Sequence, residues 1–227
     1  MEAVIVLVFF GVVYLVTRKY RAKRSESRGQ GPEELKALAE SRGWTYERNV
    51  PRLIDEFGGA GPLPVTKGVA GGDVVSGTHR GSPFRAFEHS WSTSSPTSAE
   101  IGETHADRIN CHSVWAMELN SPAPEIRILN RTWHQKLKRG TPLTTGIPRF
   151  DDNFHITAED EAAARTLLHG DLGQFLLNDG RFGDLQLEIR GNTLITWRTK
   201  HKLTPETLDA PLDFLADVVE HLPARTP

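Results

Sequence analysis

Four residues near the middle of the chain have side chains that could perform chemistry within one short stretch. His105, Asp107, Cys111 and His112 fall within eight residues. A thiolate beside an imidazole is the arrangement of a cysteine nucleophile, and imidazoles with a carboxylate can ligate zinc. The segment CHSVWAMEL that begins at Cys111 is apolar, however, which predicts a strand with a buried, unreactive thiol. Adjacent strand residues point to opposite faces, so Cys111 and His112 are not expected to bind one ion together.

The other motifs of the chain do not predict a catalytic or cofactor site. Its nine histidines include no His-Glu-x-x-His pair, and its single cysteine excludes an internal disulfide framework and a cysteine-based zinc site. The glycine-rich stretch 58–72 lacks the Gly-Lys-Ser/Thr ending of a phosphate-binding loop, and Gly-x-Ser-x-Gly is absent. We therefore expect no cofactor and no metal ion.

Short strands and turns are predicted around the four candidate residues. Residues 73–90 alternate as a hairpin, and 110–119 and 125–129 form a second strand pair, so Cys111 and His112 belong to the strand 110–119. A helix that starts near Pro32 and ends at Gly43 precedes them.

The C-terminal third has the clearest pattern. Thr157 with Asp160 predicts a helix N-terminal cap, which the helical segment EAAARTLL follows. Alternation over 185–198 predicts a hairpin, and apolar residues at helical spacing predict a long helix from Thr204 to about Leu222. Hairpins mixed with helices, without βαβ alternation, indicate an α+β fold with a mainly antiparallel sheet.

The first residues of the chain predict where the protein lies. Ala3–Val16 is apolar and without charge, and a helix extended from Met1 to Tyr20 would span about 30 Å, the thickness of a bilayer's hydrocarbon core. The alternative is a cleaved signal peptide, but its positive charge would precede the apolar run, where only Glu2 stands. This favours an uncleaved, single-pass anchor with the N-terminus outside and the rest in the cytoplasm. The membrane-flanking basic residues are Arg18, Lys19, Arg21, Lys23 and Arg24.

These patterns divide the chain into three parts. Residues 1–24 are the predicted transmembrane anchor with its basic flank, and 25–31 are a linker. Residues 32–227 form the predicted cytosolic α+β domain, either as one unit or as two lobes, 32–140 and 141–227.

Charge is unevenly distributed between these parts. The chain has a net charge of −2, and the +4 of residues 1–28 leaves about −6 for residues 29–227. A domain of this charge is a poor nucleic-acid binder, so we expect no nucleic-acid partner.

Three stretches carry a resemblance to known sequences. RFDDNFHITAEDEAAARTLL, GNTLITWRTKHKL and GTHRGSPFRAFEH, with the closing amphipathic helix, resemble a group of uncharacterised actinobacterial single-pass membrane-anchored proteins of unknown function. The resemblance covers most of the part after the anchor. It implies membrane placement and the fold class, and it brings no catalytic residue set.

Together these observations predict a membrane-tethered cytosolic domain that acts as a non-catalytic binding or scaffolding module. Its expected partners are the lipid bilayer, through the N-terminal helix, and an unidentified protein. The alternative is a membrane-tethered enzyme, such as a hydrolase, with a site near His105–His112. An enzyme should have a deep pocket with convergent polar groups, whereas a scaffold should have a flat or grooved face.

Overall fold

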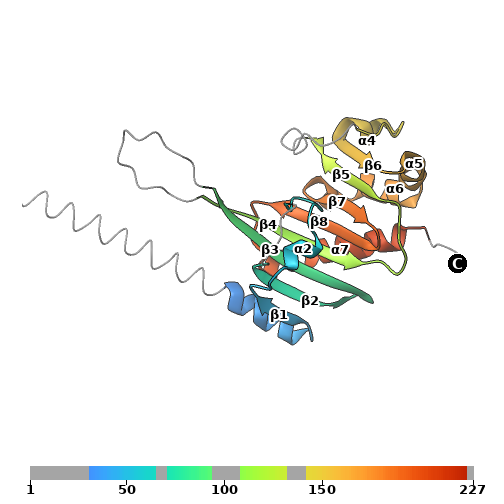
Figure 1. Ribbon diagram of the computed structural model, residues 1–227. Helices are drawn as coiled ribbons and strands as arrows, with labels where there is room; N and C mark the ends of the chain where they lie inside the picture. The colour runs from blue at the N-terminus through green and yellow to red at the C-terminus, as the bar shows by residue number, and fades with distance from the viewer. Residues whose placement is uncertain (1–30, 65–70, 94–107, 132–141, 224–227) are drawn as a thin grey trace, which may run out of the picture.

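The computed structural model of the protein describes residues 31–64, 71–93, 108–131 and 142–223 (Figure 1). The predicted anchor (1–24) and all but the last residue of the predicted linker lie outside these ranges, as do His105 and Asp107. In the part that is described, no helix combines the length and the apolar character needed to cross a membrane.

A single eight-stranded antiparallel sheet organises the molecule. Its spatial order is β1-β2-β3-β4-β8-β7-β5-β6, so strands from both sides of residue 140 are hydrogen-bonded into one sheet. β3 and β4 form the longest pairing, from Phe84 opposite Met117 to Thr93 opposite Arg108. The α+β class with an antiparallel sheet, predicted from the sequence, is confirmed. The strands are β1 (Thr45–Arg48), β2 (Asp73–His79), β3 (Ser82–Thr93), β4 (Arg108–Glu118), β5 (Ile126–Asn130), β6 (Phe154–Ala158), β7 (Gln186–Arg190) and β8 (Thr193–Thr199).

Helices cover one face of this sheet and form the larger apolar core with it (Figure 1). Leu35 and Ala39 from the helix over residues 31–41 and Leu208, Leu212 and Leu215 from the C-terminal helix are completely buried there. The amphipathic spacing of these residues explains why the helices pack on this face. The helices of this core are α4 (Pro148–Asn153), α5 (Glu161–His169), α6 (Asp171–Asn178), the 3-10 turn η1 (Gly180–Gly183) and α7 (Pro205–His221).

The opposite face is covered by α2 (Leu53–Glu56) and the loop that follows it. The backbone N–H of Gly61 donates to Glu188 Oε2 at 2.6 Å, and Arg127 Nη2 donates to the carbonyl oxygen of Gly59 at 2.8 Å. Arg127 and Glu188 also pair with each other at 2.8 Å. Gly61 has a φ of +53° and lies against Trp197, where a Cβ would come within 3.0 Å of the indole ring. The described part of the glycine-rich stretch therefore packs closely on this face of the sheet and is held there by hydrogen bonds.

Two local predictions have different outcomes. The β7–β8 hairpin is confirmed, since Arg190 is opposite Thr193 and only residues 191–192 form the turn. The predicted cap of α5 is half right. Asp160 is the N-cap and accepts from the N–H groups of Ala162 and Ala163, whereas Thr157 belongs to β6, opposite Arg127. Pairing with β5 extends the chain at Thr157, and the helix can start only after the strand ends.

Candidate binding groove

The structure separates the two described members of the predicted chemical cluster. Cys111 and His112 are consecutive residues of β4, so their side chains point to opposite faces of the sheet. Burial raises the pKa of the Cys111 thiol, and the negative charge of Glu88 raises it further. The thiol therefore stays protonated at neutral pH and is a poor nucleophile.

His112 faces another histidine instead. It lies opposite His89 in the β3–β4 ladder. Burial lowers the pKa of His112 to about 4, with a smaller contribution from His89, and burial also lowers the pKa of His89. Both imidazoles are therefore neutral at pH 7. Across the ranges that the structure describes, no group of three or more His, Cys, Asp or Glu side chains is arranged to hold a metal ion.

A groove lies at the opposite end of β4, where three segments that are distant in sequence meet. It has a volume of about 770 Å³ and lies between the C-terminal end of α7, the β4–β5 loop and the junction of α5 with α6. A neighbouring hollow of about 310 Å³ shares four of its lining residues. Those residues are Pro124, Glu220, Leu222 and Pro223.

Local sequence explains the shape of each wall. The chain leaves α7 at Leu222, which has an extended backbone (φ −72°, ψ 139°) and is followed by Pro223. The β4–β5 loop is held against the β7–β8 turn by a hydrogen bond from Ala123 N–H to the carbonyl oxygen of Gly191, 3.1 Å long. The α5–α6 corner requires Gly173, because a Cβ there would lie 1.7 Å from the carbonyl oxygen of Leu168.

The lining combines apolar walls with a few charges. Leu167, Leu222 and Pro124 supply apolar surface, and Asp171 and Glu220 supply carboxylates. Asp171 is exposed and forms no ion pair within the described residues. This composition suits a ligand segment with apolar side chains and a positive charge.

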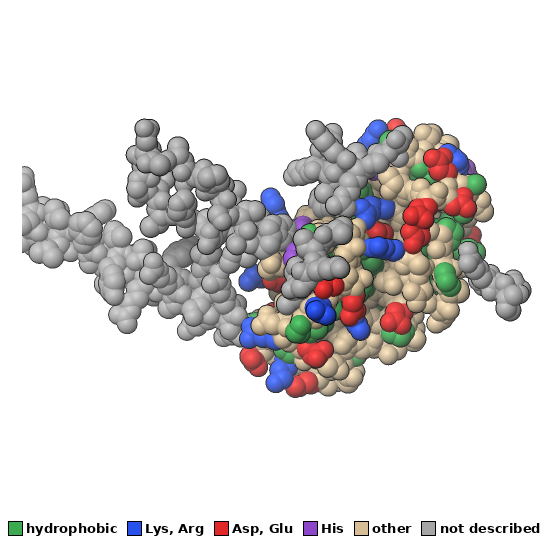
Figure 2. All heavy atoms as spheres, in the orientation of Figure 1, with side chains coloured by type: hydrophobic (Ala, Val, Ile, Leu, Met, Phe, Trp, Pro, Cys, Tyr) green, Lys and Arg blue, Asp and Glu red, His purple; other side chains and the backbone are tan. Residues whose placement is uncertain are grey.

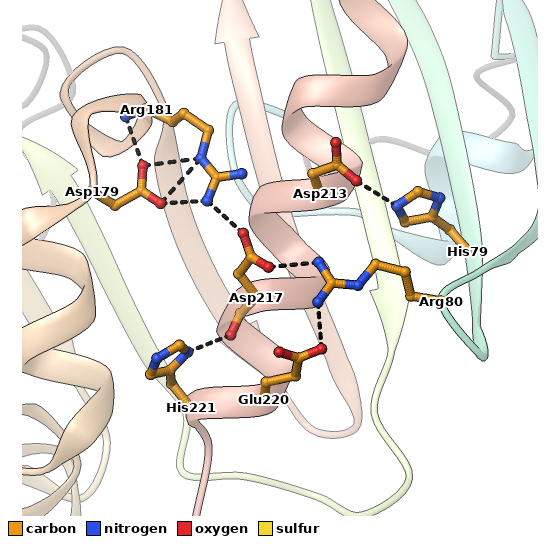
Figure 3. A network of polar contacts seen from close by, with 8 residues as sticks. All are labelled: His79, Arg80, Asp179, Arg181, Asp213, Asp217, Glu220 and His221. Carbon is orange, nitrogen blue, oxygen red and sulfur yellow. Dashed lines mark hydrogen bonds and ion pairs between the residues drawn. The ribbon is translucent and has the colours of Figure 1, made fainter.

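A network of ion pairs fixes the α7 side of the groove (Figure 3). Glu220 pairs with Arg80 from the β2–β3 turn, and Arg80 also binds Asp217 at 2.5 Å. Asp217 in turn binds Arg181 at 2.6 Å. Burial alone would raise the pKa of Asp217, but hydrogen bonds from Arg181 and Arg80 hold this pKa below its ordinary value.

His221 is held in place by the same helix. Its Nδ1 lies 2.7 Å from the carbonyl oxygen of Asp217, to which it donates. Its ring stacks on Phe175 of α6, with ring centroids 4.3 Å apart. The side chains on the α7 side of the groove are therefore held in fixed positions, and the groove is open to solvent. Both properties suit the binding of a ligand.

No pattern in the sequence predicts this groove directly. Pro122-Ala123-Pro124 and Leu222-Pro223 are visible in the sequence, but only as a loop and a helix end. Their proximity depends on the way β4, β8 and β7 pair.

Comparison with known proteins supports this description at the level of the fold. No family model and no curated protein matches the sequence. The α+β fold does resemble a solved structure. It is similar to the mycobacterial trehalose monomycolate transport factor A, TtfA, with a TM-score of 0.56 and 15% sequence identity, covering 86% of this chain and 98% of that chain. At this sequence identity the likeness to a mycobacterial protein concerns the fold alone.

Proposed function

We propose that the protein is a non-catalytic, membrane-tethered accessory factor of a lipid-transport system. The observation that carries this proposal is the fold likeness, which spans nearly the whole of a protein named as a trehalose monomycolate transport factor. Trehalose monomycolate is a glycolipid, so the proposed system moves a glycolipid of that kind. The sequence of residues 1–24 supports the tether, with the N-terminus outside and the domain in the cytoplasm.

In this proposal the groove receives a segment of a transport protein. The segment would place an apolar side chain against Leu167 and Leu222 and a basic side chain near Asp171. The chemistry at Cys111 and His112 supports a binding role over hydrolysis, because the thiol is protonated and the two side chains are on opposite faces.

Two measurements test the proposal. The first is capture of partners by the tagged full-length chain from native membranes. Leu222→Asp places a charge in the groove wall and should reduce the recovered partner about tenfold, the loss expected for a central interface contact. Val50→Asp, at a half-buried apolar residue that packs against the smaller core on the other face of the sheet, is the matched control and should retain the partner.

The second measurement is glycolipid delivery to the cell surface in cells that lack the protein. Delivery should fall, the normal chain should restore it, and the chain with Leu222→Asp should not. Normal delivery without the protein, together with no partner captured, would contradict the proposal.

A further inference from the structure

The end of the domain opposite the groove is the end at which the chain arrives from the predicted anchor. The helix over residues 31–41 and β1 run in opposite directions, because the chain reverses at Gly43, which has a φ of 69°. Residue 31 is thus at the end of β1 that carries Arg48. The end of β8 lies on the same side, since Thr199 is opposite His112 and Lys200 N–H donates to the carbonyl oxygen of Cys111 at 2.7 Å.

Four cationic side chains at this end form neither an ion pair with an acid nor a hydrogen bond to a backbone oxygen among the described residues. Among the residues whose side chains the structure describes, every other Lys or Arg bonds an acidic side chain or a backbone oxygen, as Arg42 bonds Asp209 and Arg190 bonds Gly58. Arg198 Nε is instead buried with no hydrogen-bond partner. We call the four that form no such bond in the described part of the chain the basic end: Arg52, Arg198, Lys200 and Lys202.

The backbone under two of these residues is unusual. Arg52 has a φ of 60° and Lys200 a φ of 58°, in the left-handed region that glycine and asparagine adopt most easily. A long charged residue in this conformation carries a strain that glycine would not. Backbone strain of this kind is found most often at functional sites, where the side chain takes part in binding or catalysis.

Acids near this end offset part of its positive charge. Asp73 already pairs with Arg48, whereas Glu88 accepts only from the neutral Ser90 hydroxyl and Leu203 N–H and keeps its negative charge. Figure 2 shows several Lys and Arg side chains, with some Asp and Glu among them, along the left margin of the face in view, on the side where the helix over residues 31–41 begins in Figure 1. The exposed acids Glu47 on β1 and Glu206 on α7 flank the basic end and limit its extent.

We propose that the basic end lies against anionic lipid headgroups of the membrane that holds the predicted anchor. Lys200, Lys202 and Arg52 contact headgroup phosphates, and the groove at the other end faces away from the bilayer. The linker 25–31 has seven residues and reaches at most about 25 Å, so it holds the basic end near the headgroups. This inference rests on the membrane tether of the proposed function, and it adds an orientation to it.

Lysine acetylation rates test the contact directly. The full-length chain is incorporated in vesicles of phosphatidylcholine, alone or mixed with phosphatidylglycerol, and mass spectrometry follows each lysine. Lys200 and Lys202 should react about threefold more slowly in the mixed vesicles, because each basic residue near an anionic surface is attracted to it. Lys36, which pairs with Glu40 on the helix over residues 31–41, is the internal control and should react at the same rate in both.

A second measurement reports the orientation of the domain. In a Cys111→Ser background, Ser121→Cys carries a donor dye at the groove end, and a headgroup dye is the acceptor. Energy transfer should be lower in the mixed vesicles than in the neutral ones. The double variant Lys200→Gln with Lys202→Gln should remove this difference, and Lys36→Gln should keep it.

The outcomes separate this proposal from the function proposed above. A chain that enters both kinds of vesicle but shows equal lysine rates and equal energy transfer overturns the orientation alone. A chain that enters neither kind overturns the tether, and this proposal with it.

Discussion

At the groove end, Asp171 and Glu220 stand beside apolar walls, whereas at the basic end Lys200 and Lys202 project from a polar loop. β4 begins at one of these ends and finishes at the other, and α7 spans about 25 Å between them. The comparison shows that the net charge of about −6 after the anchor conceals two surfaces of opposite character. A uniform charge of this sign would be mildly repelled by an anionic leaflet, but the four described cations that bond neither an acid nor a backbone oxygen all lie at one end.

The largest effect should come from breaking the ion pair of Arg127 with Glu188, which binds the loop after α2 to the sheet and which we call the clamp. Glu188 is 6% exposed, and Glu188→Ala leaves the charge of Arg127 buried and unpaired. The free energy of unfolding in urea should fall by about 3–5 kcal/mol. The double variant Arg127→Met with Glu188→Leu should lose much less, because no charge is left unpaired. A single variant that unfolds like the normal chain would show that the clamp does not hold the sheet cover.

A smaller change should damage the groove end alone. Gly173→Ala forces a Cβ into the carbonyl oxygen of Leu168, and should cost about 1–3 kcal/mol of unfolding free energy and most of the partner binding. Gly183→Ala is the matched control, since no atom lies within 4 Å of its Cβ position. Urea unfolding and membrane capture measure the two effects. Acetylation of Lys200 should stay as in the normal chain; a changed rate would mean that the ends are coupled.

The third prediction concerns the pH dependence of stability, which His112 near the basic end should dominate. The folded pKa of His112 is about 4, below its ordinary 6.5, so the unfolded chain binds its proton first as the pH falls. The stability from neutral His112 is thus complete above about pH 6.5 and is lost progressively towards pH 4, by about 2 kcal/mol. His112→Phe should flatten the dependence of unfolding free energy on pH in this window. His201→Asn, at an exposed histidine nearby, should not; equal slopes for all three chains would refute the assignment.

The smallest effect is expected for Lys200→Gly, which should raise stability while it weakens membrane contact. Lys200→Gly removes a charge and relieves a left-handed backbone, so the unfolding free energy should rise by about 0.5–1 kcal/mol. Lys202 should become easier to acetylate in phosphatidylglycerol vesicles. Lys202→Gly, at a residue without a positive φ, is the control: it should lower the unfolding free energy, and Lys200 should become easier to acetylate in these vesicles. Stabilisation with unchanged acetylation would argue against a membrane role for Lys200.

Sequence reasoning succeeded where the signal was local. Alternation over 185–198 identified the β7–β8 hairpin, and helical spacing from Leu208 to Leu222 identified α7. The strand with Cys111 and His112 also follows from alternation, and with it the separation of the two side chains. These features depend on neighbours within a few residues of one another.

What the sequence could not supply depends on long-range pairing. β4 pairs with β8 across a separation of about eighty residues along the chain, and no local pattern specifies that choice. The groove needs this pairing to bring Pro124 to Leu222. Arg127 and Glu188 meet through a second long-range pairing, that of β5 with β7. Thr157 was misplaced for the same reason, because the pairing of β6 with β5 overrides a plausible capping pattern.

The long β3–β4 ladder has a mechanical consequence. If one end of the domain is tethered and a moving partner pulls on the other, tension runs parallel to β4. Ten residue pairs then resist the load in shear, and their hydrogen bonds must rupture together rather than one at a time. A strand pair loaded in this way resists unravelling better than one whose hydrogen bonds open in sequence.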